Sequence, residues 1–97
     1  MNSVPLKLTG VVNECFPSHI GILVNSYFNA MVSADHLRAA GYSFDPDLQI
    51  WASEGGSETI SNQDKIHFEV DEVHEVEGAV SLEGVKPSLS LLVETEQ

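Results

Sequence analysis

Hydrophobic and polar residues alternate along much of the chain, with the period of two that is typical of half-buried β-strands. In the first such stretch, Leu6, Leu8, Gly10 and Val12 alternate with Lys7, Thr9, Val11 and Asn13. The alternation returns in Ile20, Ile22 and Val24, and again in Phe28, Ala30 and Val32. Pro17, which lacks an N–H for a strand ladder, and Asn25-Ser26 interrupt it. We predict strands over residues 5–14, 19–24 and 27–32, joined by turns.

The pattern changes at Ser33, which is a good N-cap residue, and Asp35 then follows in the first turn. Gly41 stands where a helix commonly ends. These signals predict a helix of two turns over residues 33–41. Residues 42–63 carry turn and loop signals, so we expect a long irregular connection in which residues 48–51 could form a short extra strand.

Alternation resumes in Ile66, Phe68 and Val70 and then slips in phase to Val73 and Val76, as a β-bulge would cause. A turn at Glu77-Gly78 leads to a fifth strand around residues 80–84. We place the end of the barrel at about residue 86, followed by a tail over residues 88–97 that is apolar and then acidic.

The order of these elements predicts an all-β fold. We expect a five-stranded OB-type Greek-key barrel, with a short helix between strands three and four and a long irregular insert. A chain of 97 residues has room for one such domain.

Charge limits the partners. The chain has 4 basic and 15 acidic residues, a formal net charge of −11, whereas proteins that bind nucleic acid without assistance are usually basic. Cys15 is the only cysteine, so an intramolecular disulfide is excluded and an intracellular location is favoured. No apolar run approaches the ~18 residues of a membrane span, and we expect a soluble, unsecreted chain.

No catalytic or phosphate-binding motif is present. Cys15 and His19 flank a turn but have no further ligands nearby, and the other histidines are dispersed, so we expect no metal and no cofactor. A hidden acid–base site would need His67, Glu69 and Asp71 in a cleft. The run of carboxylates that continues beyond them favours a solvated acidic face, which would attract a basic protein partner.

OB barrels often bind oligonucleotides on the outer face of strands two and three. Here that face would carry His19, Leu23, Tyr27, Asn29 and Met31, with Phe16 on the adjoining loop and Lys65 nearby. With so few cations, either weak RNA contact or a covering protein chain fits these residues. Phe44 and Trp51, in the long connection, would close one end of the barrel as a lid or anchor a partner.

The segments Gly10-Val11-Val12-Asn13, Ser18-His19-Ile20-Gly21-Ile22-Leu23-Val24 and Phe28-Asn29-Ala30-Met31-Val32 carry a family resemblance. The chain resembles the C-terminal OB domain of the larger stalk subunit of nuclear RNA polymerases, and above all the RNA polymerase I version. The resemblance is densest over residues 9–32 and extends to about residue 86. The connection, with Tyr42 and Trp51, is also similar to the insert of the polymerase II and III paralogues.

The resemblance implies a non-catalytic domain of a nuclear and nucleolar polymerase that transcribes ribosomal RNA. Its partners would be the smaller stalk subunit, an initiation factor and nascent RNA. His19, Tyr27 and Asn29 are the surface candidates that the resemblance carries over, with Arg38 and Lys65 as secondary ones. Met31 is a candidate from the outer face of strands two and three. The family's N-terminal tip domain is expected to be absent, because the chain starts almost at the first barrel strand. An equivalent polymerase II or III domain and a free-standing RNA-binding barrel are the alternatives.

Overall fold

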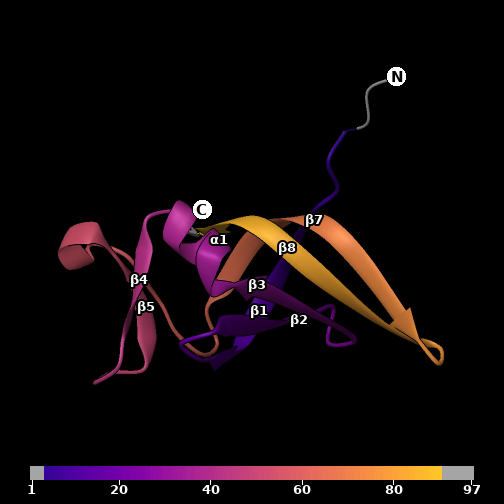
Figure 1. Cartoon of the computed structure of the whole chain (residues 1–97), viewed down its shortest axis with the longest axis horizontal. Helices are drawn as coiled ribbons and strands as arrows, with labels where there is room; N and C mark the ends of the chain where they lie inside the picture. Colours follow the sequence, from indigo (N-terminus) through magenta and orange to yellow (C-terminus); the bar gives the residue numbers. More distant parts are fainter. Residues whose placement is uncertain (1–3, 91–97) are drawn as a thin grey trace, which may run out of the picture.

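The structure, a computed structural model, describes residues 4–90, so most of the expected tail lies outside the described residues. Five strands close into a barrel (Figure 1). They are β1 (Lys7–Cys15), β2 (His19–Val24), β3 (Phe28–Ser33), β7 (Lys65–Val76) and β8 (Ala79–Leu89).

The order around the barrel is β1-β2-β3-β8-β7, and β7 closes it by pairing with β1. Every pair is antiparallel except β3 with β8, which is parallel. This Greek-key order is that of an OB fold, and the predicted fold class is confirmed. The inward residues of the alternating runs fill the core, with Val12, Ile20, Ile22, Val32, Ile66 and Phe68 at most 1% exposed.

The predicted helix is confirmed as α1 (Ala34–Ala39), directly after β3. The Ser33 hydroxyl caps it by accepting a hydrogen bond from the His36 backbone N–H at 3.4 Å. Ala34 and Leu37 face the core. Within residues 4–90, no helix has the length and apolar character needed to cross a membrane.

The connection is not irregular as expected, because it contains a second, three-stranded sheet. The extra strand expected at residues 48–51 is present in part, shifted to Ile50–Ser53. Its strands are β4 (Tyr42–Asp45), β5 (Ile50–Ser53) and β6 (Thr59–Ile60), and a 3₁₀ turn, η1 (Glu54–Gly56), follows β5. The Asp45 carboxylate closes the β4–β5 turn by accepting from the backbone N–H groups of Asp47 and Leu48. Strands this short show little periodicity. Burial of Tyr42, Trp51 and Ile60 against the barrel stabilises them instead.

This sheet covers one end of the barrel. Trp51 is fully buried, and its indole N–H donates to the Phe16 carbonyl oxygen at 3.0 Å, which ties β5 to the β1–β2 loop. Phe44 is half-buried and packs against the Trp51 ring with 5.5 Å between centroids. This is the geometry of a lid. Beyond the other end, the β7–β8 hairpin projects away from the barrel (Figure 1).

β7 and β8 contain irregularities that the alternation indicated only in part. The register shifts between Val70 and Glu72, where the bulge was predicted. It shifts again where His67 pairs with Ser88 and Glu69 with Val85, which leaves Lys86 and Pro87 opposite the single residue Phe68. Proline is tolerated at a bulge. The strand therefore continues to Leu89, and the expected end of the barrel near residue 86 is too early.

Gly84 is required by the core, because an added Cβ would overlap the ring of the fully buried Phe68. We expect Gly84→Ala to lower the free energy of unfolding by about 1–3 kcal/mol, the usual cost of overpacking. Urea denaturation would measure it. Ser81→Ala, an exposed position on the same strand, is the control and should change stability by less than ~0.5 kcal/mol. Equal midpoints for Gly84→Ala and the unmodified chain would contradict this account of the core.

Tyr42 connects β4 to the β5–β6 segment through its hydroxyl, which donates to Glu58 Oε1 at 2.8 Å. Burial and the neighbouring Glu58 carboxylate raise the pKa of Tyr42 to about 12. An unfolded tyrosine loses its proton near pH ~10. Between about pH 10 and 12 the native state therefore holds a proton that the unfolded state has lost, and stability falls as pH rises through this window.

We expect Tyr42→Phe to show a smaller loss of stability across that alkaline window than the unmodified chain. Unfolding free energies at about pH 9 and about pH 11 would measure the difference. Tyr27→Phe serves as the control, because Tyr27 is 77% exposed and lies on the β2–β3 loop. The same alkaline loss in Tyr42→Phe as in the unmodified chain would exclude Tyr42 as its source.

Candidate functional site

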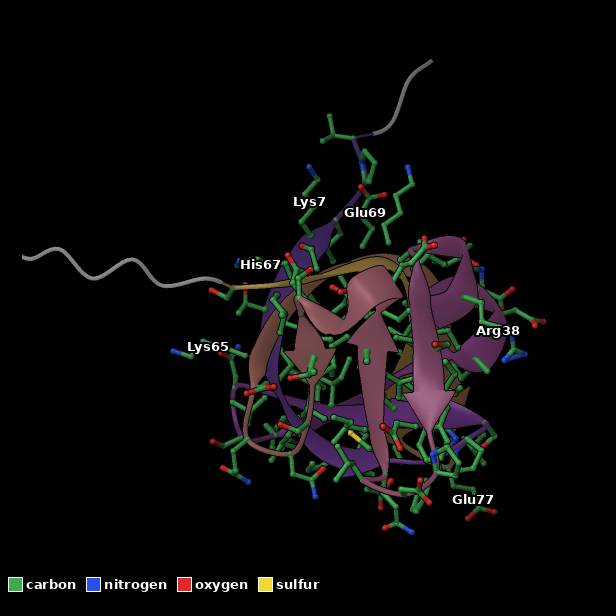
Figure 2. The ribbon with its side chains drawn as sticks, turned by 90° about the vertical axis from the view of Figure 1, so that its left-hand side faces the viewer. Lys7, Arg38, Lys65, His67, Glu69 and Glu77 are labelled. Atoms are coloured by element: carbon green, nitrogen blue, oxygen red, sulfur yellow. The ribbon has the colours of Figure 1, made fainter. Side chains whose placement is uncertain are left out.

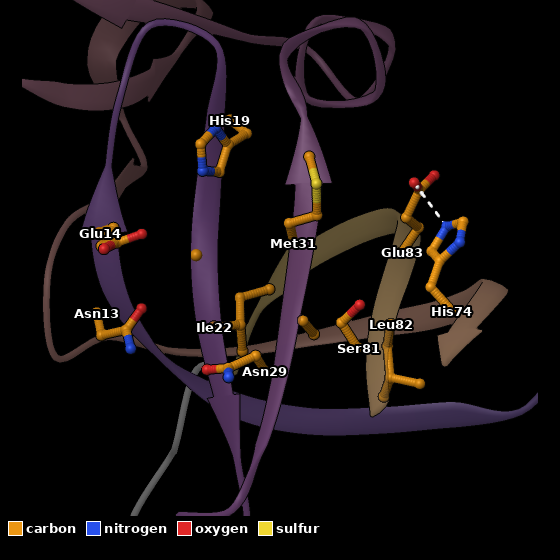
Figure 3. Close-up of a pocket in the computed structure, with 12 residues that line it drawn as sticks. Asn13, Glu14, His19, Ile22, Asn29, Met31, His74, Ser81, Leu82 and Glu83 are labelled. Atoms are coloured by element: carbon orange, nitrogen blue, oxygen red, sulfur yellow. Dashed lines mark hydrogen bonds and ion pairs between the residues drawn. The ribbon is translucent and has the colours of Figure 1, made fainter. Parts of the chain in front are cut away.

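A groove with a volume of about 290 Å³ crosses the outer face of the barrel (Figure 3). Strands β1, β2, β3 and the first half of β8 form it, together with one residue of β7, His74. Its lining residues are Asn13, Glu14, His19, Gly21, Ile22, Asn29, Ala30, Met31, His74, Ser81, Leu82 and Glu83.

The floor of the groove is low because Gly21 has no side chain. Gly21 pairs with Glu14 on β1 and with Met31 on β3, so the gap lies in the middle of three strands. The β1 register shifts between Val12 and Glu14, and both Asn13 and Glu14 line the groove. A Cβ on Gly21 would lie 2.9 Å from Glu14 Oε1 and 3.0 Å from Asn13 Oδ1. These side chains therefore occupy part of the space that a larger residue would fill.

His19 lies at the start of β2 and is half-buried. Its Nδ1 is 2.9 Å from the Ser18 hydroxyl, and its ring lies 5.4 Å from the Phe16 ring, so neighbours on the β1–β2 loop hold its orientation. Asn29 and Met31 alternate on the outer side of β3, one exposed and one half-buried. The structure thus brings three of the predicted binding residues into one groove.

The far wall is acidic. Glu72 and Glu83 are direct cross-strand neighbours, an unfavourable arrangement for two like charges. His74 Nε2 lies 2.9 Å from Glu83 Oε2 (Figure 3). It also lies 3.4 Å from Glu72 Oε1, so the imidazole stands between the two carboxylates. The ligand atoms of these three residues lie within 4.8 Å of one another. A closed zinc site has four ligands, and residues 4–90 bring no fourth protein ligand to this group.

The charges of the groove determine what it can bind. Glu14 and Glu83 are carboxylates in its lining, and none of its lining residues is a lysine or an arginine. Phosphate groups would therefore meet repulsion here, since nucleic-acid affinity depends on cations. Carboxylate and amide oxygens, two imidazoles and the half-buried Met31 are suited to a polypeptide that brings hydrogen-bond donors or positive charge.

The other predicted binding residues lie elsewhere. Tyr27 is on the β2–β3 loop, edge-on to Phe28, and does not line the groove. Arg38 is on α1 within 3.5 Å of Asp35, and Lys65 begins β7 beside a hollow that reaches the β2–β3 loop. Arg38 and Lys65 lie on opposite sides of the molecule in Figure 2, so they form no shared basic patch.

The three residues of the acid–base hypothesis are not gathered in a cleft. His67 Nδ1 is 2.7 Å from the Thr9 hydroxyl, and Glu69 is 3.8 Å from Lys86 Nζ. Asp71 is exposed at the β7 bulge itself, between Val70 and Glu72. His67 and Glu69 line the same hollow, but Asp71 does not, and the first two side chains contact different neighbours, which is not the geometry of a paired acid and base.

Cys15 and His19 also have separate environments. The Cys15 thiol donates to the Ile60 carbonyl oxygen at 3.6 Å and so contacts the second sheet, whereas His19 lines the groove. Burial, and the nearby Asp64 carboxylate, raise the pKa of the Cys15 thiol. A thiol held in its protonated form is a poor nucleophile and a poor metal ligand.

The comparison with protein families decides the identity. The family described as the RPA43 OB domain in RNA Pol I matches residues 3–85, which is most of the chain. The chain belongs to this family. No curated protein matches the chain at a significant level.

Membership confirms the resemblance to the RNA polymerase I version of the stalk subunit. The chain is an OB domain of a polymerase I stalk subunit and acts in transcription. Its partners include other polymerase subunits, and its location is the nucleus.

Sequence reasoning missed the walls of the groove. Ser81 and Glu83 alternate with Val80, Leu82 and Gly84, so their outward direction was readable. Their position beside β3 follows from the parallel β3–β8 pairing of the OB topology, which could have identified them. No pattern in the sequence indicated that Asn13 and Glu14 both line the groove, because that depends on the register shift in β1.

Proposed function

We propose that this domain is a non-catalytic docking module of RNA polymerase I, and that the groove on its outer face binds a segment of a polymerase I initiation factor. The observation that supports this most directly is the groove itself. It is open, polar and acidic, and it lies on the face that OB barrels commonly use for binding.

The size and chemistry of the groove favour a protein ligand. Its volume, about 290 Å³, is at the lower limit of the ~300–1000 Å³ typical of small-molecule pockets. Protein interfaces need no deep cavity, because they combine a few half-buried anchors with a polar rim. Met31 and His19 are suitable anchors, and Asn29, Asn13 and Ser81 supply the polar rim.

The smaller stalk subunit is the second protein partner that we propose. The sheet of β4, β5 and β6 offers it a separate surface, on which Leu48 is 67% exposed at the β4–β5 turn. Trp51 does not serve as an anchor in this scheme, since its side chain is fully buried. Together, the two contacts fit a role in ribosomal RNA synthesis in the nucleolus.

Nascent RNA is the other candidate ligand, at a different place. Tyr27 is 77% exposed on the β2–β3 loop, and Lys65 lies beside a hollow lined by Asn25 and Ser26 of the same loop. A stacked base contributes ~1–3 kcal/mol, so this ring and one cation would give weak, salt-sensitive binding. Any RNA affinity should therefore fall on Tyr27→Ala and be unaffected by changes in the groove.

Affinity capture tests the proposal. The tagged full chain is incubated with nuclear extract, with and without ribonuclease, and the bound proteins are identified by mass spectrometry. We expect polymerase I subunits and an initiation factor, retained after ribonuclease treatment. The double variant His19→Ala/Asn29→Ala should lose the factor and keep the subunits. Recovery that disappears with ribonuclease would instead favour RNA as the ligand, and capture of the factor by the double variant would exclude the groove.

A further inference from the structure

The β7–β8 hairpin has an open edge. β1 pairs with β7 only from Lys65 to Glu69, and the last hydrogen bond on that side runs from the Val70 N–H to the Leu6 carbonyl oxygen at 2.8 Å. From Glu72 to Val76, β7 still pairs with β8 on its other side, and Asp71 is the unpaired residue at the register shift. No strand within residues 4–90 pairs with this free edge, which we call the arm edge (residues 71–76).

The arm edge stands clear of the barrel. Every residue from 71 to 79 is exposed, and the hairpin extends past the other strands in Figure 1. Two of its hydrophobic side chains are far more exposed than is usual for a strand, Val73 at 62% and Val76 at 68%. An edge strand with free backbone groups and exposed valines is a ready template for one further strand.

Its side chains specify what that strand should contain. The arm edge reads Asp71-Glu72-Val73-His74-Glu75-Val76, and Glu77 follows at the turn, without a lysine or arginine in this stretch. Side chains on an added strand would lie ~4.5–5.5 Å from those directly opposite. Basic residues would therefore face the three carboxylates, and apolar residues would face the two valines.

The carboxylates of the arm edge disfavour two other ligands, a second copy of this chain and RNA. A second copy of this chain, paired edge to edge, would place carboxylates against carboxylates, which is unfavourable. RNA phosphates would meet the same repulsion. The carboxylates thus keep neutral and acidic strands away from an edge that is otherwise prone to pairing, and a basic strand is accepted.

We infer that the arm edge binds an extended basic segment of a partner protein by β-strand addition, with basic side chains opposite Asp71, Glu72 and Glu75 and apolar ones opposite Val73 and Val76. This site adjoins the groove, because His74 also lines the groove wall. It uses the free backbone edge of β7, however, and does not depend on the function proposed for the groove. Main-chain hydrogen bonds provide the affinity, and the alternation of charge and valine provides the selectivity.

A peptide of the complementary pattern tests this. Acetylated Val-Lys-Thr-Val-Lys-Lys amide is titrated into the isotope-labelled full chain and followed by NMR. We expect the largest shifts in the backbone amides of residues 71–76, together with slower hydrogen exchange there. The double variant Glu72→Lys/Glu75→Lys should bind the peptide at least about tenfold more weakly, since two attractive contacts with the basic peptide become repulsive.

Two controls separate strand addition from general charge attraction. The matched variant Asp47→Lys/Glu54→Lys changes the net charge equally, at the exposed turns on either side of β5, and should bind like the unmodified chain. The scrambled peptide Lys-Lys-Lys-Val-Thr-Val has the same charge and should bind more weakly. The inference would be overturned if both double variants bound the peptide equally weakly, or if both peptides bound equally well. It would also be overturned if the NMR shifts lay outside the arm edge, or if the peptide did not bind at all.

Discussion

Trp51→Ala is expected to lower the free energy of unfolding by about 3–5 kcal/mol, the range for truncating a large buried aromatic residue. Trp51 is fully buried, and its indole N–H is hydrogen-bonded to the Phe16 carbonyl oxygen. The substitution leaves a cavity where the second sheet covers the barrel and an unpaired carbonyl on the β1–β2 loop. The total free energy of unfolding of a typical protein is ~5–15 kcal/mol, so the variant should be marginally folded at 37 °C.

Equilibrium denaturation in urea measures this effect. Trp51→Phe is the informative second variant, because it keeps most of the buried surface and removes the hydrogen bond. Its loss of unfolding free energy should be clearly smaller than that of Trp51→Ala. Leu48→Ala is the control in the same hairpin, where the side chain is 67% exposed, and should change stability by less than ~0.5 kcal/mol. If Trp51→Ala is as stable as Leu48→Ala, Trp51 is not part of a lid on the barrel.

The second large effect is expected from Gly21→Leu, which should reduce binding of the initiation factor at least about tenfold while the fold is retained. A leucine here fills the middle of the groove between Glu14 and Met31. Its Cβ would lie closest to the ends of the Glu14 and Asn13 side chains, which are flexible and can turn outward. It would also lie 3.3 Å from Glu14 Cβ, a contact that a shift of a few tenths of an ångström relieves. Loss of the groove without loss of the barrel is therefore the physical expectation, and a factor of ten corresponds to ~1.4 kcal/mol.

Binding is measured by titrating the full chain against the factor that the capture experiment identifies, and folding by circular dichroism and thermal unfolding. Ser43→Leu is the matched control, because it adds the same side chain at an exposed position of β4, on the second sheet. If the Gly21→Leu variant does not fold, the same titration is made with Gly21→Ala, which fills less of the same space. Unchanged affinity in a folded Gly21→Leu variant would contradict the role of the groove.

The barrel was predictable because its strands are long and one-sided. Ile20, Ile22 and Val24 on β2 point inward as their alternation indicated, and the Glu77-Gly78 turn has the two positive φ angles, +52° and +83°, of a tight hairpin. The second sheet was not predictable in the same way. Its strands have two to four residues, and they depend on burial of Tyr42 and Trp51 against another part of the chain.

The site was predictable only along β2 and β3. His19, Asn29 and Met31 share a face because they belong to neighbouring strands with a tight connection. Three other candidates lie away from this face: Tyr27 is on the β2–β3 loop, Arg38 is on α1, and Lys65 is on β7, across the barrel. Glu83 and His74 came to the groove through the parallel β3–β8 contact, between strands that are distant in the chain.

Site-specific photo-crosslinking inside assembled RNA polymerase I tests the central claim most directly. A photoreactive phenylalanine analogue replaces Asn29, which is exposed in the groove, and separately replaces Arg38, which is exposed on α1. We predict that the probe at residue 29 crosslinks to a segment of the initiation factor, and that the probe at residue 38 does not. Crosslinks from residue 29 to RNA alone, or the same products from both positions, would contradict the assignment of this groove as the protein-docking site.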